Sequence, residues 1–416
     1  MRLIHTVLAS LAAVLAVAAL APLANAADLA VIHAKLYASP AAMAVEDATV
    51  LAHDGRIVAV GHALPVPKGA TIVDARGGAV TYGLWNSHIH LMTPDLIPAK
   101  DKTAAQLSAS LEGMLTRWGF TTVFDIASPF ENTKVIRRRI ASGEVTGPMI
   151  LTVGDAFFPK NGTPIYVKAF FKQYGFPSWE IDSLPAAEAR ARRELADGTD
   201  GLKLFIGAIV GGKIGVLQMP TNQAKALADI AHAHHKPVFA HPSNTEGVEN
   251  AIRSGVDILA HTTPEDSPWS PELIARMRAH HMALIPTMTL FDVENRRAGA
   301  SQAEVERVMT VAVGQLKAYS DTGGQILFGT DVGYIDTFDT TDEYRQMARA
   351  LDWRQILASL TTDPAERFGY AAHKGRVAKG MDADLVVLDG DPAKDVSAFA
   401  RVRDTIRDGK VIYAAK

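Results

Sequence analysis

The stretch GLWNSHIHL, residues 83–91, contains the pattern on which the fold prediction rests. An apolar run typical of a buried strand ends in His88 and His90, which are two positions apart. Because side chains alternate along a strand, both imidazoles can point to the same side. The stretch therefore predicts a buried strand whose carboxyl end presents two polar, metal-binding side chains.

Seven further apolar runs follow, separated by segments of helical texture rich in Ala, Arg and Glu. They are FTTVFDI (120–126), PMILTVG (148–154), GLKLFIG (201–207), KPVFAH (236–241), VDILAH (256–261), MALIPTMTL (282–290) and QILFGTD (325–331). Eight strands alternating with helices over about 250–300 residues are typical of an α/β fold of the (β/α)8 TIM-like barrel type. We expect this barrel over residues 81–370, with its chemistry at the carboxyl ends of the strands.

The residues on either side of the predicted barrel, 27–80 and 371–416, have the texture of β-structure. The first flank contains DATVLAHDGRIVAVG (47–61), in which an Asp-Gly pair joins two alternating apolar runs, as in a β-hairpin. The second flank contains ADLVVLD (383–389). We expect the two flanks to pair into one small β-sandwich domain built from both ends of the chain.

The composition is that of a soluble globular protein, with 416 residues, 48% hydrophobic and 21% charged. A formal net charge of -3 and the lack of a basic run argue against a nucleic-acid binder, which needs a surplus of Lys and Arg. The chain has no cysteine. Any transition-metal site must therefore use His, Asp, Glu or a modified Lys.

The first 26 residues, MRLIHTVLASLAAVLAVAALAPLANA, predict a secretory signal peptide. A transmembrane anchor is the alternative, but Pro22 and the small residues Ala24-Asn25-Ala26 favour cleavage after Ala26. No later stretch is long and apolar enough to span a bilayer. We expect an exported, periplasmic protein without stable membrane insertion once the signal is removed.

Four more predicted strands carry a polar residue in or just after their apolar run: Lys203, His241, His261 and Asp331. Alone, each has an ordinary explanation, such as a satisfied polar group or, for Asp331, a helix cap. In a barrel, however, the carboxyl ends of all the strands meet at one mouth. Together with the first two histidines, these residues predict a metal site there.

This set of residues, inside a barrel with a divided β-domain, closely resembles the amidohydrolase superfamily of metal-dependent hydrolases. The ending GRVAKGMDADLVVLDGDP (375–392) is similar to the C-terminal signature of that family. The resemblance extends over essentially the whole chain after residue 26. The lysine on the fourth strand resembles the binuclear branch, and the texture is most similar to prolidase-like dipeptidases and related amide hydrolases.

The resemblance implies two divalent metal ions and a carbon dioxide-derived carbamate on Lys203 that bridges them. It assigns His88, His90 and Asp331 to one metal, and His241 and His261 to the other. A hydroxide between the metals would be the nucleophile, and Asp331 would act as general base and then general acid. Zinc is the expected metal for such a site, and manganese or cobalt could also serve.

The chemistry of a buried lysine agrees with this assignment. Apolar surroundings lower the pKa of Lys203 toward a nucleophilic neutral amine. The alternative is an unmodified Lys203 that pairs with a buried acid.

The sequence departs from the family pattern in two places, and the resemblance does not imply substrate contacts there. The entry to the first strand has Trp85 and Asn86 where other members commonly have different residues. The third strand reads Gly154-Asp155-Ala156-Phe157-Phe158, where prolidase-like members often show a Gly-Gly-His that helps to bind substrate. Prolidase specificity is therefore in doubt.

Eight aromatic residues lie between residues 157 and 179, after the third strand. They predict either an aromatic wall or lid over the metals, or a structural patch on the barrel or on a neighbouring subunit. Within this segment, Tyr166 and Lys168 are candidates for contacting the scissile carbonyl or a substrate carboxylate.

The main functional hypothesis is hydrolysis of an amide bond in a small molecule such as a dipeptide or an N-acyl amino acid. A cyclic amide, a lactone or an aromatic xenobiotic amide is the alternative among hydrolase substrates. The same scaffold could also carry an isomerase or a decarboxylase, or it could be a catalytically silent periplasmic binding or scaffold protein. We also expect a homo-oligomer, on the ground that oligomers are common among soluble proteins.

Overall fold

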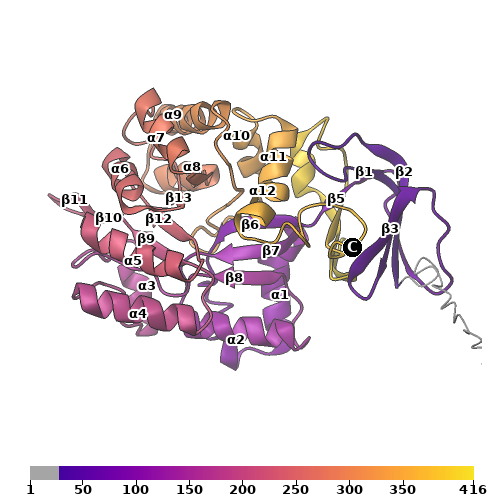
Figure 1. The fold of residues 1–416 in the computed structure, drawn as a ribbon, viewed down its shortest axis with the longest axis horizontal. Coiled ribbons are helices and arrows are strands. Elements are labelled where there is room, and N and C mark those ends of the chain that lie inside the picture. Colours follow the sequence, from indigo (N-terminus) through magenta and orange to yellow (C-terminus); the bar gives the residue numbers. More distant parts are fainter. Residues whose placement is uncertain (1–27) are drawn as a thin grey trace, which may run out of the picture.

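The computed structural model describes residues 28–416 and contains two parts, a small β-domain and a larger α/β barrel (Figure 1). The predicted signal peptide lies outside the described residues. Within residues 28–416, no helix has the length and apolar character needed to cross a membrane.

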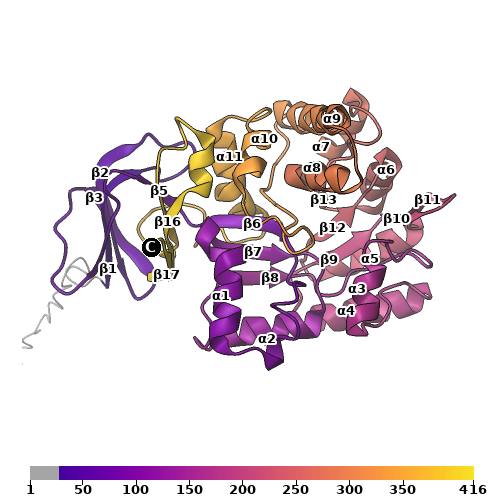
Figure 2. The same cartoon turned by 180° about the vertical axis from the view of Figure 1, so that it is seen from behind.

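The β-domain is one eight-stranded sheet made from both ends of the chain. Its strands are β1 (Leu29–Leu36), β2 (Val45–His53), β3 (Arg56–His62), β4 (Thr71–Asp74), β5 (Ala79–Tyr82), β15 (Leu385–Leu388), β16 (Val402–Arg407) and β17 (Lys410–Ala414). The order is β17-β16-β15-β5-β1-β2-β3, with β4 paired to β1. Figures 1 and 2 show the N-terminal and C-terminal strands beside each other at one end of the molecule.

The predicted hairpin is present between β2 and β3, which pair antiparallel. Asp54 and Gly55 form its turn with φ angles of 47° and 72°. The tight two-residue hairpin turn requires a positive φ angle at both central residues, and an Asp-Gly pair favours this turn.

The barrel strands are mutually parallel and follow one another around a ring. They are β6 (Leu84–Ile89), β7 (Phe120–Asp125), β8 (Met149–Thr152), β9 (Leu202–Phe205), β12 (Val238–His241), β13 (Ile258–Ala260) and β14 (Ala283–Ile285). The segment 325–332 completes the ring. The backbone N–H of Leu327 donates to the carbonyl of Leu284 (2.9 Å), and the carbonyl of Phe328 accepts from the N–H of Ser87 (2.7 Å).

The gap between β8 and β9 is closed by Phe157, whose backbone N–H donates to the carbonyl of Lys203 at 2.8 Å. The α/β barrel fold is thus confirmed. One predicted strand needs correction: in MALIPTMTL (282–290), only Ala283–Ile285 is strand, and the chain enters helix α8 at Met288. Residues 282–290 read as one apolar run, and apolar runs do not distinguish a buried strand from the start of a buried helix.

Helices cover the outside of the barrel and the connections. They are α1 (Ala104–Met114), α2 (Phe130–Ala141), α3 (Lys168–Tyr174), α4 (Leu184–Ala196), α5 (Thr221–Ala233), α6 (Thr245–Ser254), α7 (Pro271–Ala279), α8 (Met288–Arg297), α9 (Gln302–Asp321), α10 (Thr341–Met347), α11 (Trp353–Leu360) and α12 (Thr362–Arg367). Short 3-10 helices are η2 (Ala99–Asp101), η3 (Thr116–Trp118) and η4 (Val396–Ala400). Side chains such as Thr103, Ser301 and Asp352 cap helix N-termini by accepting backbone N–H bonds.

A two-stranded hairpin, β10 (Gly207–Gly211) and β11 (Gly215–Gln218), follows β9 directly. It projects from the barrel on the side away from the β-domain (Figures 1 and 2). This hairpin lies beside the aromatic segment, since Ile165 donates its backbone N–H to the carbonyl of Ile209 at 3.0 Å.

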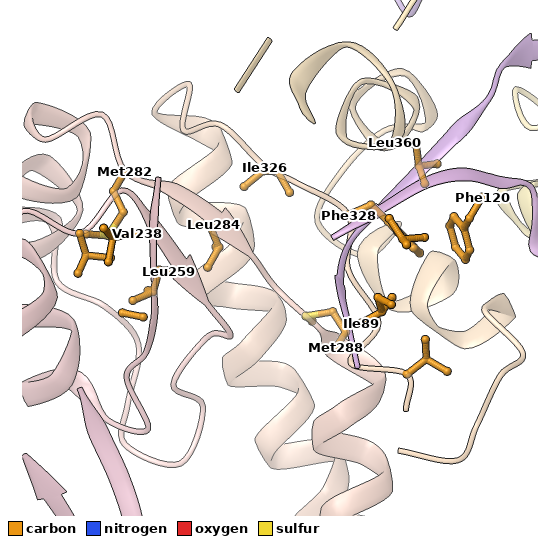
Figure 3. Packing of buried hydrophobic residues seen from close by; sticks show 14 of the residues in the cluster. Ile89, Phe120, Val238, Leu259, Met282, Leu284, Met288, Ile326, Phe328 and Leu360 are labelled. Carbon is orange, nitrogen blue, oxygen red and sulfur yellow. The ribbon is translucent and has the colours of Figure 1, made fainter. Parts of the chain in front are cut away.

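The largest apolar core packs the barrel strands against their helices. Figure 3 shows part of it, including Phe120, Phe328 and Leu360. Phe328 is fully buried, and its ring centroid lies 5.8 Å from that of Phe120. Because Phe328 precedes Asp331 by three residues, this packing fixes the backbone that carries the carboxylate.

A buried ionic cluster lies where the chain passes from the β-domain to the barrel. The Lys374 ammonium contacts Asp384 at 2.6 Å and Asp382 at 3.1 Å. The Tyr82 hydroxyl donates to Asp384 at 3.3 Å, and Asp384 is fully buried. Asp382 also pairs with Arg56 at 2.5 Å, so it is Asp384 that depends on the lysine for charge compensation, because buried charges are costly unless they are paired.

We predict that Lys374→Met lowers the free energy of unfolding by about 3–5 kcal/mol, because it leaves Asp384 as an uncompensated buried charge. Guanidinium unfolding of the two proteins measures this difference. The double variant Lys374→Met/Asp384→Asn should recover part of the loss, since the two residues are in contact. A single variant as stable as the wild type would contradict the proposed dependence.

Candidate metal centre

The structure brings together all six residues predicted as metal ligands, at the carboxyl ends of the barrel strands. They line one cavity of about 210 Å³ and come from β6 and the residue after it, β9, β12, the residue after β13 and the segment 325–332: His88, His90, Lys203, His241, His261 and Asp331. The arrangement follows from the parallel barrel, in which every strand ends at the same face.

Asp331 lies at the centre of this cluster. Its Oδ1 is 3.1 Å from Nε2 of His88 and 2.8 Å from Nε2 of His90, and its Oδ2 is 4.0 Å from Nε2 of His261. Ligand atoms of His88, His261 and Asp331 all lie within 4.8 Å of one another, as a metal site requires. The His241 ring stands next to that of His261, with centroids 4.6 Å apart.

Two of these residues have a strained backbone. Asp331 has a φ angle of 61° and His261 one of 83°, both in the left-handed region that non-glycine residues avoid. Hydrogen bonds hold these conformations: the Asp331 N–H donates to the His88 carbonyl at 2.9 Å, and the His261 N–H donates to the Ile285 carbonyl at 2.8 Å. Such strain is typical of functional sites, where the surrounding structure holds it in place.

Hydrogen bonds at Nδ1 aim the Nε2 atoms of two histidines at the cluster. Nδ1 of His90 lies 2.8 Å from the carbonyl of Ala127, which can only accept, so this nitrogen carries the hydrogen. Nδ1 of His261 lies 2.6 Å from the Thr287 hydroxyl, which donates its own hydrogen to the Pro286 carbonyl. In the neutral rings, Nε2 then has a free lone pair, as a metal ligand needs.

The charge states also suit a cation. Burial lowers the pKa of His88 to about 4, and it lowers the pKa values of His241 and His261 well below the ordinary value. Burial alone would raise the pKa of Asp331, but His88 and His90 hold it well below its usual range. Beside the Asp331 carboxylate, the cavity thus presents three imidazoles that burial keeps neutral, those of His88, His241 and His261. Oδ1 of Asp331 is buried without a hydrogen-bond donor among the described residues, so the donor set fits a divalent cation.

Lys203 is 1% exposed. Among the side chains described, none forms an ion pair with its ammonium group. Burial lowers its pKa to about 7, although the charge of Asp331 opposes that shift. A substantial fraction of the Lys203 side chains is therefore neutral near pH 7. The neutral amine is the form that can react as a nucleophile.

The Thr287 hydroxyl is itself held by the start of α8. Thr287 has a φ angle of 46°, and the next two backbone N–H groups, of Met288 and Thr289, donate to the Glu343 carboxylate at 2.8 and 2.7 Å. Glu343 is fully buried, and burial raises its pKa to about 7. This carboxylate fixes the first turn of α8 and therefore the oxygen that orients His261.

Aromatic side chains form the wall of the cavity above the cluster. They are Phe158, Tyr166, Phe171, Trp179, Phe205, Phe291 and Tyr334. The first four belong to the aromatic segment 157–179, so part of that segment is the predicted wall. Other members are structural: Phe157 is in the main core, and Phe170 and Phe176 pack behind the wall.

Arg190 on α4 ties the aromatic segment to the barrel at both ends. Its guanidinium lies 3.7 Å from the centroid of the Phe157 ring, and it donates to the carbonyls of Ala156 (2.6 Å) and Trp179 (3.2 Å). The segment is therefore anchored where it leaves the strand and where it returns.

Of the two predicted substrate contacts, the structure places Tyr166 in the cavity wall and Lys168 outside it. Lys168 begins α3 with its side chain exposed and does not line the cavity. The contact of Lys168 with substrate stays a prediction, from an exposed position outside the cavity lining. The hydroxyl-bearing rings of Tyr166 and Tyr334 lie side by side, with centroids 5.1 Å apart.

Sequence reasoning missed Thr287, Glu343 and Tyr334. Glu343 is 55 residues from Met288, whose N–H it accepts, so only the fold reveals the pairing. Tyr334 follows Asp331 by three residues, and its place near a strand end is the signal that could have found it. His232, by contrast, lies outside the cluster and pairs with Asp257 at an exposed position, 2.8 Å away.

A barrel with a buried cluster of histidines, a lysine and a carboxylate at the carboxyl ends of its strands defines a class of metal-dependent hydrolases. A sequence model of the amidohydrolase family matches residues 79–412, and the chain belongs to that family. It is thus a metal-dependent amidohydrolase, a hydrolase that acts on carbon–nitrogen bonds.

Individual relatives are distant. The chain is 22% identical over 378 residues to a dihydroorotase of Citrifermentans bemidjiense, covering 83% of this chain and 86% of that one. It is 24% identical over 367 residues to an enamidase of Eubacterium barkeri, covering 83% of each. A crystal structure of a Xaa-Pro dipeptidase with bound methionine in the active site matches with a TM-score of 0.77 and 20% identity, covering 93% of this chain and 100% of that one.

We predict that Thr287→Val weakens zinc binding about 10–100-fold, the usual loss when a group that orients a metal ligand is removed. Valine has nearly the same shape as threonine but cannot accept the Nδ1 hydrogen of His261. Competition with a chromophoric chelator measures the affinity. Thr287→Ser, which keeps the hydroxyl, is the matched control, and equal affinity of the valine variant and the wild type would exclude this role.

Proposed function

We propose that the protein hydrolyses an amide bond in a small substrate with an aromatic or branched apolar group, a class that includes dipeptides and N-acyl amino acids. The observation that carries the proposal is the Asp331 carboxylate clustered with four imidazoles and Lys203 at the floor of an aromatic-walled cavity. A single site then offers charge for catalysis and apolar surface for binding.

In this proposal two divalent ions, zinc by preference, occupy the cluster. His88, His90 and Asp331 would hold one ion, and His241 and His261 the other, with carboxylated Lys203 between them. Bound divalent ions supply Lewis acidity, which activates water and polarises the scissile carbonyl.

The carbamate on Lys203 requires only carbon dioxide. The lone pair of the neutral amine forms a bond to the carbon of carbon dioxide, one proton passes from the nitrogen to water, and the carbamate carries one negative charge. Burial without an ionic partner favours this reaction, because it destabilises the ammonium form.

Proton transfer is assigned to Asp331. Its carboxylate accepts a proton from the attacking water as the oxygen bonds to the carbonyl carbon, and it returns a proton to the amide nitrogen as the C–N bond breaks. Tyr166 can donate its hydroxyl to the substrate carbonyl. Burial, together with the charge of Asp331, raises the pKa of Tyr166 and keeps that hydroxyl protonated.

The apolar wall supports a second candidate, an aromatic xenobiotic amide. Phe158, Phe171 and Trp179 offer aromatic surface, and the Gly-Gly-His motif of prolidase-like members is absent from the third-strand segment. The N-terminal sequence pattern supports export to the periplasm.

The first experiment screens dipeptides, N-acyl amino acids and aromatic amides by mass spectrometry, using zinc-loaded protein prepared with bicarbonate. We expect cleavage by the wild type and a loss of about 100-fold or more in kcat/KM for Lys203→Ala, since metal catalysis supplies several kcal/mol. Lys225→Ala, an exposed lysine on α5 paired with Asp229, is the matched control. Turnover that survives in Lys203→Ala would refute the proposed centre.

A second experiment tests the carbamate. Protein stripped with a chelator and reloaded with zinc should regain full amidase activity in the presence of bicarbonate, and only a small part of it in buffer freed of carbon dioxide. Bicarbonate-independent recovery would show that Lys203 acts unmodified.

A further inference from the structure

The outer half of the cavity is lined by one face of α8. Leu290, Phe291, Glu294 and Asn295 line the cavity, in the i, i+1, i+4 and i+5 pattern of a single helix face. The same helix starts at the residue that follows Thr287, which orients His261. A helix rises 1.5 Å per residue, so the backbone of Glu294 lies about 10 Å from that of Thr287 along the axis.

The charges at this outer end are mainly negative. Glu265 and Glu294 line the cavity, and Asn295, the neighbour of Glu294 in the chain, donates to Glu265 at 3.3 Å. Arg297 is already engaged, with one nitrogen 2.8 Å from Glu294 and another 2.8 Å from Asp336. Because this guanidinium is shared between two carboxylates, it offsets only part of the negative charge.

Within the described part of the chain, the cavity wall contains no arginine, and its one lysine is Lys203 in the metal cluster. Recognition of a substrate carboxylate normally uses an arginine or a lysine. The cavity thus lacks the usual partner for a carboxylate away from the metal centre.

Aromatic rings stand next to Glu294. Tyr334 is close to both Glu294 and Asp331: burial raises its pKa, and the charges of these two residues raise it further. The Tyr166 ring packs against Tyr334. Aromatic faces attract cations, and their combination with a carboxylate suits an ammonium group.

We propose that this outer site binds a substrate ammonium group, so that the protein prefers amides with an amine at the end away from the scissile bond and disfavours those with a carboxylate there. The inference rests on the proposed amidase function and narrows its substrate class. An N-acyl amino acid without an amine then fits less well than an amide of an amine-bearing acyl group.

Three matched compounds test the inference: benzanilides whose benzoyl ring carries a para aminomethyl, methyl or carboxylate group. Calorimetry gives the Kd of each for the zinc-loaded protein, and liquid chromatography gives kcat/KM. We expect the aminomethyl compound to bind at least about tenfold more tightly than the carboxylate compound, the result of roughly 1.4 kcal/mol of differential interaction.

Glu294→Gln should reduce the binding ratio of aminomethyl to methyl compound, and it should improve carboxylate binding because Arg297 loses a partner. Asp292→Asn is the matched control, since Asp292 is on the same helix, pairs with Arg296 at 2.9 Å and does not line the cavity. It should keep the wild-type ratios.

The outcomes separate the two proposals. Tight binding of the aminomethyl compound without cleavage of any compound would refute the proposed amidase function but support the outer ammonium site. Four results would overturn the outer site. They are cleavage of all three compounds with equal Kd values, tighter binding of the carboxylate compound, no detectable binding of any compound, and a preference for the aminomethyl compound that is unchanged in Glu294→Gln.

Discussion

The buried carboxylate of Asp331 is the constraint on which the rest of the site depends. A carboxylate taken out of water must be compensated, and here burial keeps the neighbouring imidazole of His88 neutral. A neutral imidazole offers a lone pair rather than charge. A divalent cation between these groups would compensate the carboxylate and accept the imidazole lone pairs, and a carbamate on Lys203 would add an anionic ligand.

The barrel holds the cluster under strain. Asp331 and His261 have left-handed backbones, and a Cβ on Gly329 would lie 2.7 Å from the Cβ of His88. The eighth segment therefore approaches β6 more closely than other residues permit, and this approach sets Asp331 against both histidines. Strain of this kind persists only where the surroundings are rigid, as the packing of Phe328 against Phe120 provides.

Much of this arrangement could be predicted from sequence, because parallel strands place their carboxyl ends together. Apolar runs located the eight strand segments, and the polar residues within or after them located the six clustered side chains. The prediction failed where tertiary packing decides. Thr287 leaves the seventh run in a left-handed turn, a contact with Glu343 fixes α8, and Lys168 is exposed at the start of α3, outside the cavity lining. No local pattern encodes those three facts.

The central claim is that the six clustered residues hold two divalent ions bridged by a modified lysine. Anomalous X-ray diffraction at the zinc edge, from crystals of the zinc-loaded protein grown with bicarbonate, tests it most directly. The account predicts two anomalous peaks, one at His88, His90 and Asp331 and one at His241 and His261, with carbamate density on Lys203. An unmodified Lys203 paired with Asp331, and no anomalous peak in the cavity, would contradict it.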